Sequence, residues 1–170
     1  MHEQQAEQIP ISEVMHPHPH CVTEQQRVRD LVSLFLDKGI SAAPVVDDSG
    51  KPIGLVSKTD VAREIKEDHR ANRPESEPSV QPWWDEERLS QLTVGEIMTP
   101  TLYTFSPSTT VADATAAMAF EGLHHLPVVE DSGRLVGMLS ALDLLDWFAR
   151  QAGYQPADGH QGQVFKRPGQ

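Results

Sequence analysis

A seven-residue stretch occurs twice in this chain, and this repetition constrains the fold more than any other feature of the sequence. Residues 54–60 read GLVSKTD and residues 137–143 read GMLSALD, which gives an offset of 137 − 54 = 83 residues. The same offset aligns residues 11–61 with residues 94–144 without a gap, and 15 of these 51 positions are identical. We therefore expect two copies of one supersecondary unit that fold against each other, because a unit of about fifty residues is small for burying a core alone.

The composition narrows the class of protein. With 170 residues, of which 38% are hydrophobic, the chain suits one compact unit or two small ones. It contains no apolar run of about 18 residues and no basic-then-apolar start, so we expect neither a membrane span nor a signal segment. Cys21 is the single cysteine, which excludes an intrachain disulfide and favours the cytoplasm. The net charge of −11 argues against nucleic-acid binding, although a local pocket could still hold one small phosphate ligand.

Each copy predicts a helix with one apolar face and a glycine at its end. The apolar face follows the spacing i, i+3, i+4, i+7 in the first copy at Val28, Leu31, Val32 and Phe35. The same places in the second copy hold Val111, Ala114, Thr115 and Met118. Thr23 and Ser106 are the predicted cap residues, the first with a glutamine three positions later and the second before a proline. Gly39 and Gly122 are the predicted stops, because glycine readily adopts the left-handed conformation.

A β-hairpin and a second helix follow in each copy. The expected strands are residues 42–46, 51–56, 126–129 and 134–139. Small polar residues and a glycine separate the two strands of each hairpin and predict a tight turn. The second helices are expected to begin at Ser57 and Ser140 and to end near residues 69 and 151. In the last helix the inner side is predicted to carry Leu144, Leu145 and Phe148.

These signals divide the chain into five parts. They are a lead-in at 1–10, a first repeat at 11–69, an insert at 70–93, a second repeat at 94–151 and a tail at 152–170. The tail is rich in Gly, Gln and Pro, which predicts disorder. The insert carries Trp83 and Trp84, and we expect at least one of these large aromatic side chains to pack on the repeats or on a partner.

The end of each hairpin carries the pattern Ser-x-x-Asp, which has two interpretations. In the first, Ser57 with Asp60 and Ser140 with Asp143 are helix caps, each contributing about 1 kcal/mol to stability. In the second, the pattern is a ligand site. A carboxylate can accept both hydroxyls of a ribose, while a serine hydroxyl and a helix N-terminus can bind phosphate. The two interpretations are compatible, because cap residues and ligand residues can coincide.

The repeat resembles the CBS domain, and the tandem arrangement resembles the CBS pair, or Bateman module. The similarity rests on the Pro-Val-Val strand and the Gly-x-x-Ser-x-x-Asp ending, which occur in order in both copies, and it covers residues 11–68 and 94–150. It implies an α+β fold of two repeats (short strand, helix, β-hairpin, helix) packed with pseudo-two-fold symmetry. It also implies adenosine nucleotides in clefts between the repeats and a homodimer of two modules. The chain looks like a stand-alone module, without a catalytic or channel domain.

The resemblance assigns nucleotide-binding residues position by position. In the first copy these are Thr23, Ile40, Ala42, Pro44, Ser57, Lys58 and Asp60. In the second copy they are Ser106, Leu123, His125, Pro127, Ser140 and Asp143. The apolar members would line an adenine slot, and their alternative role is ordinary core. The two aspartates would hold the ribose.

The two predicted sites differ in charge, so we expect them to be unequal. Lys58 supplies a cation for phosphate in the first copy, whereas the second copy offers His124, His125 and Arg134. If a histidine contacts phosphate, affinity should rise as the pH falls below about 6.5, where free imidazole gains its proton.

The sequence favours a regulatory module that senses AMP, ADP, ATP or a related adenosyl ligand, requires no cofactor and acts on a regulated protein. The alternative is a structural or protein–protein module with empty clefts. An enzyme is disfavoured, because the chain has no Walker loop and no spacing that suggests a nucleophile–base pair. A metal site at His16, His18 and His20 is also disfavoured, because the intervening prolines hold the segment extended and alternate side chains diverge.

Overall fold

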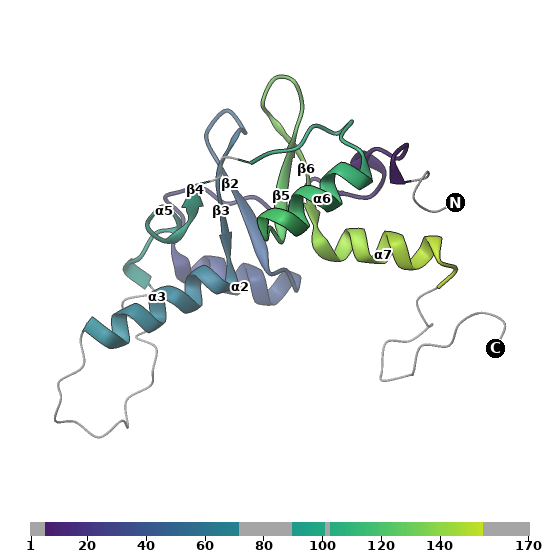
Figure 1. Cartoon of the computed structure of the whole chain (residues 1–170). Helices are drawn as coiled ribbons and strands as arrows, with labels where there is room; N and C mark the ends of the chain where they lie inside the picture. The colour runs from purple at the N-terminus through teal and green to yellow at the C-terminus, as the bar shows by residue number, and fades with distance from the viewer. Residues whose placement is uncertain (1–5, 72–89, 101–102, 155–170) are drawn as a thin grey trace.

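The computed structural model describes residues 6–71, 90–100 and 103–154, so the tryptophan pair and most of the tail lie outside the described residues. The first repeat contains η1 (Ile11–Glu13), β1 (His16–Pro17), α2 (Val28–Lys38), β2 (Ala42–Val46), β3 (Pro52–Ser57) and α3 (Lys58–Ala71). The second contains α5 (Val94–Ile97), β4 (Thr99–Pro100), α6 (Val111–Glu121), β5 (His125–Val129), β6 (Leu135–Ser140) and α7 (Ala141–Gln151). The expected α+β fold of two repeats is confirmed (Figure 1).

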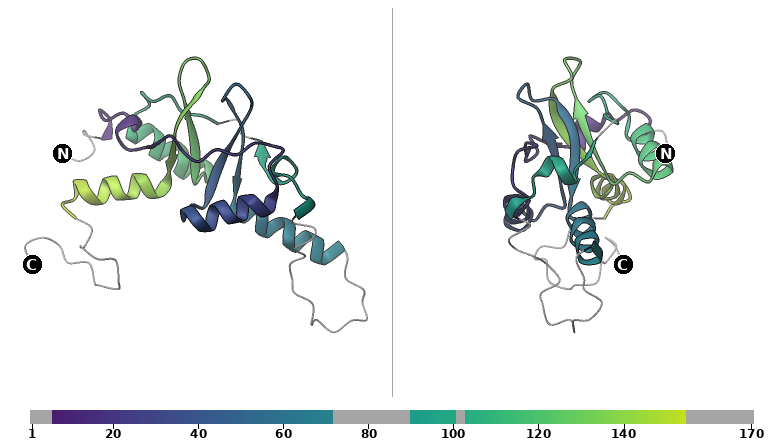
Figure 2. Two further views of the ribbon diagram at one scale, coloured as in Figure 1. Left: turned by 180° about the vertical axis from the view of Figure 1, so that it is seen from behind. Right: turned by 90° about the vertical axis from the view of Figure 1, so that its left-hand side faces the viewer.

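The two hairpins match the predicted strands to within one residue at each end. β2 pairs antiparallel with β3, and β5 pairs antiparallel with β6. Gly50 and Gly133 adopt φ angles of 79° and 81° in the two turns, as the turn prediction requires. The turns lie side by side (Figure 2), and the Leu135 N–H donates a hydrogen bond of 3.0 Å to the Gly50 carbonyl. The repeats therefore meet along their hairpins.

The short lead-in strand of each repeat belongs to the sheet of the other repeat. β1 of the first repeat pairs with β6 of the second, with Pro17 opposite Gly137. β4 of the second repeat pairs with β3 of the first, with Pro100 opposite Gly54. Over the described residues, the sheets have the strand orders β1-β6-β5 and β2-β3-β4. The repeats are thus interlocked by strand exchange, which the order of elements along the sequence does not reveal.

Each repeat also contributes buried apolar side chains to the core of the other repeat. Ile11 in η1 is fully buried in the core of the second repeat. Val94 and Ile97 in α5 are buried in the core of the first. Backbone bonds fix these lead-ins, since the Ile11 N–H donates to the Thr109 carbonyl at 2.8 Å and the Val94 N–H donates to the Gln26 carbonyl at 2.8 Å. Each repeat therefore completes the other's core.

The predicted starts of the first helices were wrong in both copies. α2 begins at Val28 rather than Thr23, and its N-cap residue makes no side-chain cap bond. α6 begins at Val111 rather than Ser106, and its cap is Thr110, whose hydroxyl oxygen accepts the Asp113 N–H at 3.1 Å. The reason is tertiary. The Val28 N–H, the first of α2, donates to the Leu92 carbonyl just before α5, and the Val111 N–H, the first of α6, donates to the Ile9 carbonyl just before η1. These bonds to the other repeat decide where each helix starts.

The helix ends and most apolar faces agree with the sequence predictions. Gly39 and Gly122 end α2 and α6 in the left-handed conformation, with φ of 64° and 66°. In α7, Leu144 is buried and Phe148 is half-buried against the second core, as expected. Leu145 was predicted to face inward but is exposed, because it lies about 100° around the helix from the buried Leu144.

Candidate functional site

The two Ser-x-x-Asp patterns lie where a hairpin strand passes directly into a helix. Ser57 is the last residue of β3, before α3, and Ser140 is the last residue of β6, before α7. The first helical N–H groups are already engaged, because Lys58 N–H donates to the Ser41 carbonyl at 2.9 Å and the equivalent group of α7 donates to the His124 carbonyl at 3.0 Å. The helix starts therefore offer fewer free N–H groups to a phosphate than the sequence suggested.

Asp60 forms hydrogen bonds with the backbone and side chain of Ser57 and with Arg63. Its Oδ2 accepts the Ser57 N–H at 2.8 Å and the Ser57 hydroxyl at 2.6 Å, and its own N–H lies 3.4 Å from the Ser57 oxygen. Its Oδ1 accepts a bond from Arg63 Nη1 at 3.0 Å. Asp60 is 7% exposed and is the single buried charged side chain among the described residues. The capping interpretation is confirmed here, with an added ion pair.

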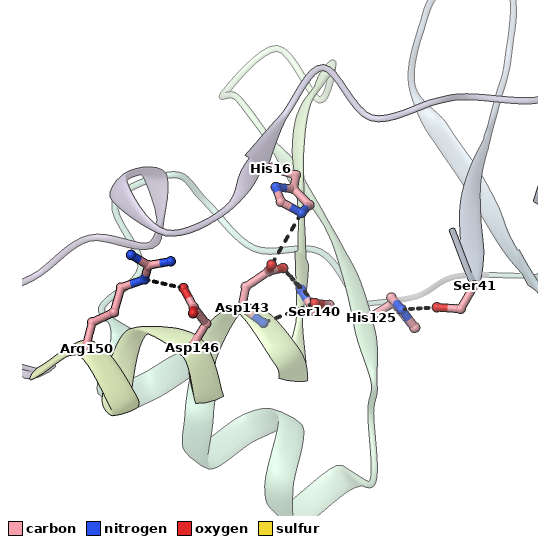
Figure 3. A network of polar contacts seen from close by, with 7 residues as sticks. All are labelled: His16, Ser41, His125, Ser140, Asp143, Asp146 and Arg150. Carbon is pink, nitrogen blue, oxygen red and sulfur yellow. Dashed lines mark hydrogen bonds and ion pairs between the residues drawn. The ribbon is translucent and has the colours of Figure 1, made fainter. Parts of the chain in front are cut away.

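Asp143 repeats the cap but not the ion pair. Its Oδ2 accepts the Ser140 N–H and the Ser140 hydroxyl, both at 2.7 Å, and the Asp143 N–H donates to the Ser140 oxygen at 3.2 Å. Among the described residues, the contact at Oδ1 is His16 Nε2, 3.5 Å away (Figure 3). His16 comes from β1, so the first repeat reaches over the site of the second through the exchanged strand.

His125 lies at the seam between the repeats. It begins β5, and its Nε2 is 3.2 Å from the hydroxyl oxygen of Ser41, which directly precedes β2 (Figure 3). Burial lowers the pKa of His125 below 6.5, and the neighbouring His124 lowers it further, while the charge of Asp143 opposes both effects. This shift of the pKa favours the neutral form of His125, so a ligand phosphate beside it would have to overcome the shift to stabilise the protonated form.

The other predicted site residues divide into core and surface positions. Ala42, Pro44 and Pro127 are buried, and Ile40 and Leu123 are half-buried against their cores. The core interpretation of these side chains therefore holds, and a role in binding adenine remains a prediction.

The polar candidates lie on the surface. Thr23, Ser106 and Lys58 are exposed. Thr23 and Ser106 directly follow Val22 and Phe105, whose N–H groups donate to the two proline carbonyls at 3.0 Å and place this approach segment beside the hairpin.

Arg134 does not reach the second site. It lies just before β6, at the hairpin turn, and its Nε would be 3.6 Å from a Cβ placed on Gly50. Ser140 is at the other end of that strand, about 20 Å away at the usual rise per residue. Arg134 is therefore removed as a candidate cation for this site.

Sequence reasoning missed Arg63, His16 and Ser41 as neighbours of the candidate site. The Arg63 contact had a usable signal, since an aspartate and an arginine three positions apart on a helix face each other. The positions of His16 and Ser41 depend on the strand exchange and on the seam, for which the sequence carries no local signal.

Neither a metal cluster nor a membrane span is found in the described part of the chain. Within residues 6–71, 90–100 and 103–154, no three His, Cys, Asp or Glu side chains converge as metal ligands would. None of the helices described there is long and apolar enough to cross a bilayer.

Comparison with known proteins places both repeats in one family. The family model of the CBS domain matches residues 11–67 and again residues 94–150. MJ1426 of Methanocaldococcus jannaschii is 28% identical over 142 residues, which cover 75% of this chain and 84% of that protein. The chloroplastic CBS domain-containing protein CBSX2 of Arabidopsis thaliana is 28% identical over 133 residues, which cover 71% of this chain. The match spans just over half of CBSX2, 55%.

Solved structures share the fold. The structure of CBSX2 in complex with AMP has a TM-score of 0.65 and 24% identity, covering 84% of this chain and 98% of that one. The CBS domain pair of MJ0100 in complex with 5′-methylthioadenosine and S-adenosyl-L-methionine has a TM-score of 0.68 and 19% identity, with 84% and 98% covered. At these identities the likeness establishes the fold.

Proposed function

The chain belongs to the CBS domain family, and on that premise we propose that it is a regulatory module that binds an adenosine-containing ligand where its two repeats meet. The observation that carries the proposal is the position of Asp143, whose cap uses Oδ2 and leaves Oδ1 beside His16 and near the seam histidine His125. A carboxylate oxygen in this position can accept ribose hydroxyls. The ligands named for CBSX2 and MJ0100 share adenosine and differ beyond the 5′ carbon.

Each part of the ligand has a proposed neighbour. The ribose would bond to Asp143, and the adenine would lie beside the strand around Pro127 and the preceding Leu123. The 5′ group of the ligand would face the Ser140 end of α7 and the neighbouring histidines. A protonated histidine there would attract the anionic phosphates of AMP, ADP or ATP. Binding would regulate by favouring one shape of the module, or of a partner complex, over another.

A non-catalytic role fits the chemistry of the serine. The Ser140 hydroxyl donates its proton to Asp143, and Ser57 does the same to Asp60, so both serve as caps. A serine nucleophile instead needs a base that accepts its proton and passes it on. We place the protein in the cytoplasm, where the exposed thiol of Cys21 would stay reduced.

We also propose a homodimer through the helices of the second repeat. α6 and α7 present three exposed large apolar side chains, Phe120, Leu142 and Leu145. The positions 83 residues earlier, in the first repeat, hold Asp37, Thr59 and Ala62. In the first repeat, Leu36 on α2 is also exposed, so the second repeat carries three of the four exposed large apolar side chains on the long helices described. Side chains of this kind are suited to burial against a second copy.

The oligomeric state tests this part separately. Light scattering after gel filtration should give twice the chain mass for the wild type and a reduced mass for Leu145→Glu, while the matched variant Ala62→Glu should stay dimeric. A wild-type monomer would refute the dimer. If Leu145→Glu removes binding to another protein without changing the mass, the face serves the alternative role as a protein–protein module.

The ligand proposal is tested by thermal shift with AMP, ADP, ATP and S-adenosylmethionine, with ribose 5-phosphate as the control without adenine. At 100 times its Kd a ligand stabilises the fold by about 2.7 kcal/mol, which raises Tm by about 5–11 °C in a chain of this size. Asp143→Asn should remove the shift. If none of the four compounds raises Tm, the structural alternative is favoured.

A further inference from the structure

The carboxylates of Asp60 and Asp143 differ in the group that contacts Oδ1, the oxygen that the helix cap does not use. Asp60 and Asp143 correspond under the repeat, since 60 + 83 = 143. Asp60 Oδ1 is bonded by Arg63, one helical turn further along α3. The position that corresponds to Arg63 in α7 is Asp146, which instead accepts a bond from Arg150 Nε at 2.6 Å (Figure 3). Arg63, which bonds to the first carboxylate, thus corresponds to an acidic residue, Asp146, in the second repeat.

This difference changes how many lone-pair positions each carboxylate can offer to a ribose. A carboxylate offers about four lone-pair positions, and a ribose diol needs two. At Asp60 the cap uses Oδ2 twice, and Arg63 adds a charge-assisted bond to Oδ1 of a carboxylate that is 7% exposed. Although the Arg63 side chain is 56% exposed, neutral ribose hydroxyls would have to compete with its charge-assisted bond to a carboxylate that is largely buried.

The contact at the second carboxylate is weaker. His16 Nε2 lies 3.5 Å from Asp143 Oδ1, which is beyond the usual hydrogen-bond range, and the His16 side chain is 79% exposed. An exposed side chain on a two-residue strand can turn aside with little loss of packing. Both positions on Asp143 Oδ1 can therefore serve a ribose.

We propose that the chain binds one adenosine ligand, at Asp143, and that Arg63 closes the first site by occupying its ribose acceptor. This inference rests on the proposed function and deepens it, because it names which repeat binds and which residue excludes binding from the other. The ligand site is also shared between the repeats, since His16 enters it from the first repeat on the exchanged strand β1.

The test is the stoichiometry of AMP binding to the full chain by isothermal titration calorimetry, with S-adenosylmethionine as a second probe. The wild type should bind one molecule per chain, and Asp143→Asn should lose it, while Asp60→Asn should keep it. Arg63→Gln, which keeps most of the side-chain stem, should open a second site with affinity raised about tenfold or more over the wild-type first site. The control Arg150→Gln removes the helical ion pair with Asp146 in α7 and should leave one site.

A transplant tests the same idea in the opposite direction. Asp146→Arg places an arginine one turn after Asp143 and should weaken AMP binding about tenfold or more. Combined with Arg63→Gln it should move the single site to Asp60. Two equal wild-type sites, or a single site lost with Asp60→Asn, would overturn the inference while leaving the proposed function intact. If neither probe binds any variant, the proposed function itself fails.

Discussion

The strand exchange makes an unusual prediction about Ile11, a residue of the first repeat. Its side chain is fully buried in the core of the second repeat. Truncating a buried isoleucine to alanine costs about 2–5 kcal/mol, and full burial points to about 3 kcal/mol here. For a chain of this size, Ile11→Ala should therefore lower Tm by about 6–12 °C.

The location of the damage is more informative than its size. Hydrogen exchange should show that Ile11→Ala lowers amide protection first in α6, α7, β5 and β6, although the mutated residue is more than eighty positions away in the sequence. Ile53→Ala, at a half-buried isoleucine that packs against the first core, is the control and should act, at a smaller cost, on α2, β2 and β3. A cost of less than about 1 kcal/mol for Ile11→Ala, or a loss of protection confined to the first repeat, would refute the exchange.

Three further predictions follow from single contacts. Thr110→Ala should cost about 1 kcal/mol of unfolding free energy in urea, because it removes the observed cap, and Ser106→Ala should cost close to nothing. Gly54→Ala should cost about 1–3 kcal/mol by the same assay, because a Cβ there would lie 2.7 Å from Met98 Sδ; a neutral substitution would contradict this packing. The folded pKa of His125 is below its reference of 6.5, so stability should fall as the pH drops from about 6.5 to that lower pKa, where the unfolded chain binds the extra proton. The slope of unfolding free energy against pH should be smaller in His125→Gln, and an unchanged slope would show that this residue is not responsible.

Local signals in the sequence were sufficient for much of the fold. The repeat, the hairpin strands, the turn glycines and the two serine caps depend on neighbours within a few residues, so their patterns could be read directly. The starts of α2 and α6 could not, because Thr23 and Ser106 have good capping chemistry but the exchanged lead-ins decide where each helix begins. Propensity was overruled by tertiary hydrogen bonds in both copies.

The residues of the candidate site were predicted only where a local sequence pattern identifies them. Both aspartates were found from spacing, and the expectation of unequal sites was based on Lys58 and the histidines. The difference proposed here lies elsewhere, at the bond from Arg63 to Asp60, which a search for helical ion pairs would have identified. The approach of His16 to Asp143 comes from strand pairing between distant segments, and no local pattern encodes it.

The most direct test of the central claim is a crystal structure of the full chain grown with AMP. The account predicts one AMP per chain, with its ribose hydroxyls bonded to Asp143 Oδ1, its adenine beside the strand around Pro127, and the Arg63–Asp60 pair intact. AMP bound at Asp60, or bound away from both carboxylates, would contradict it.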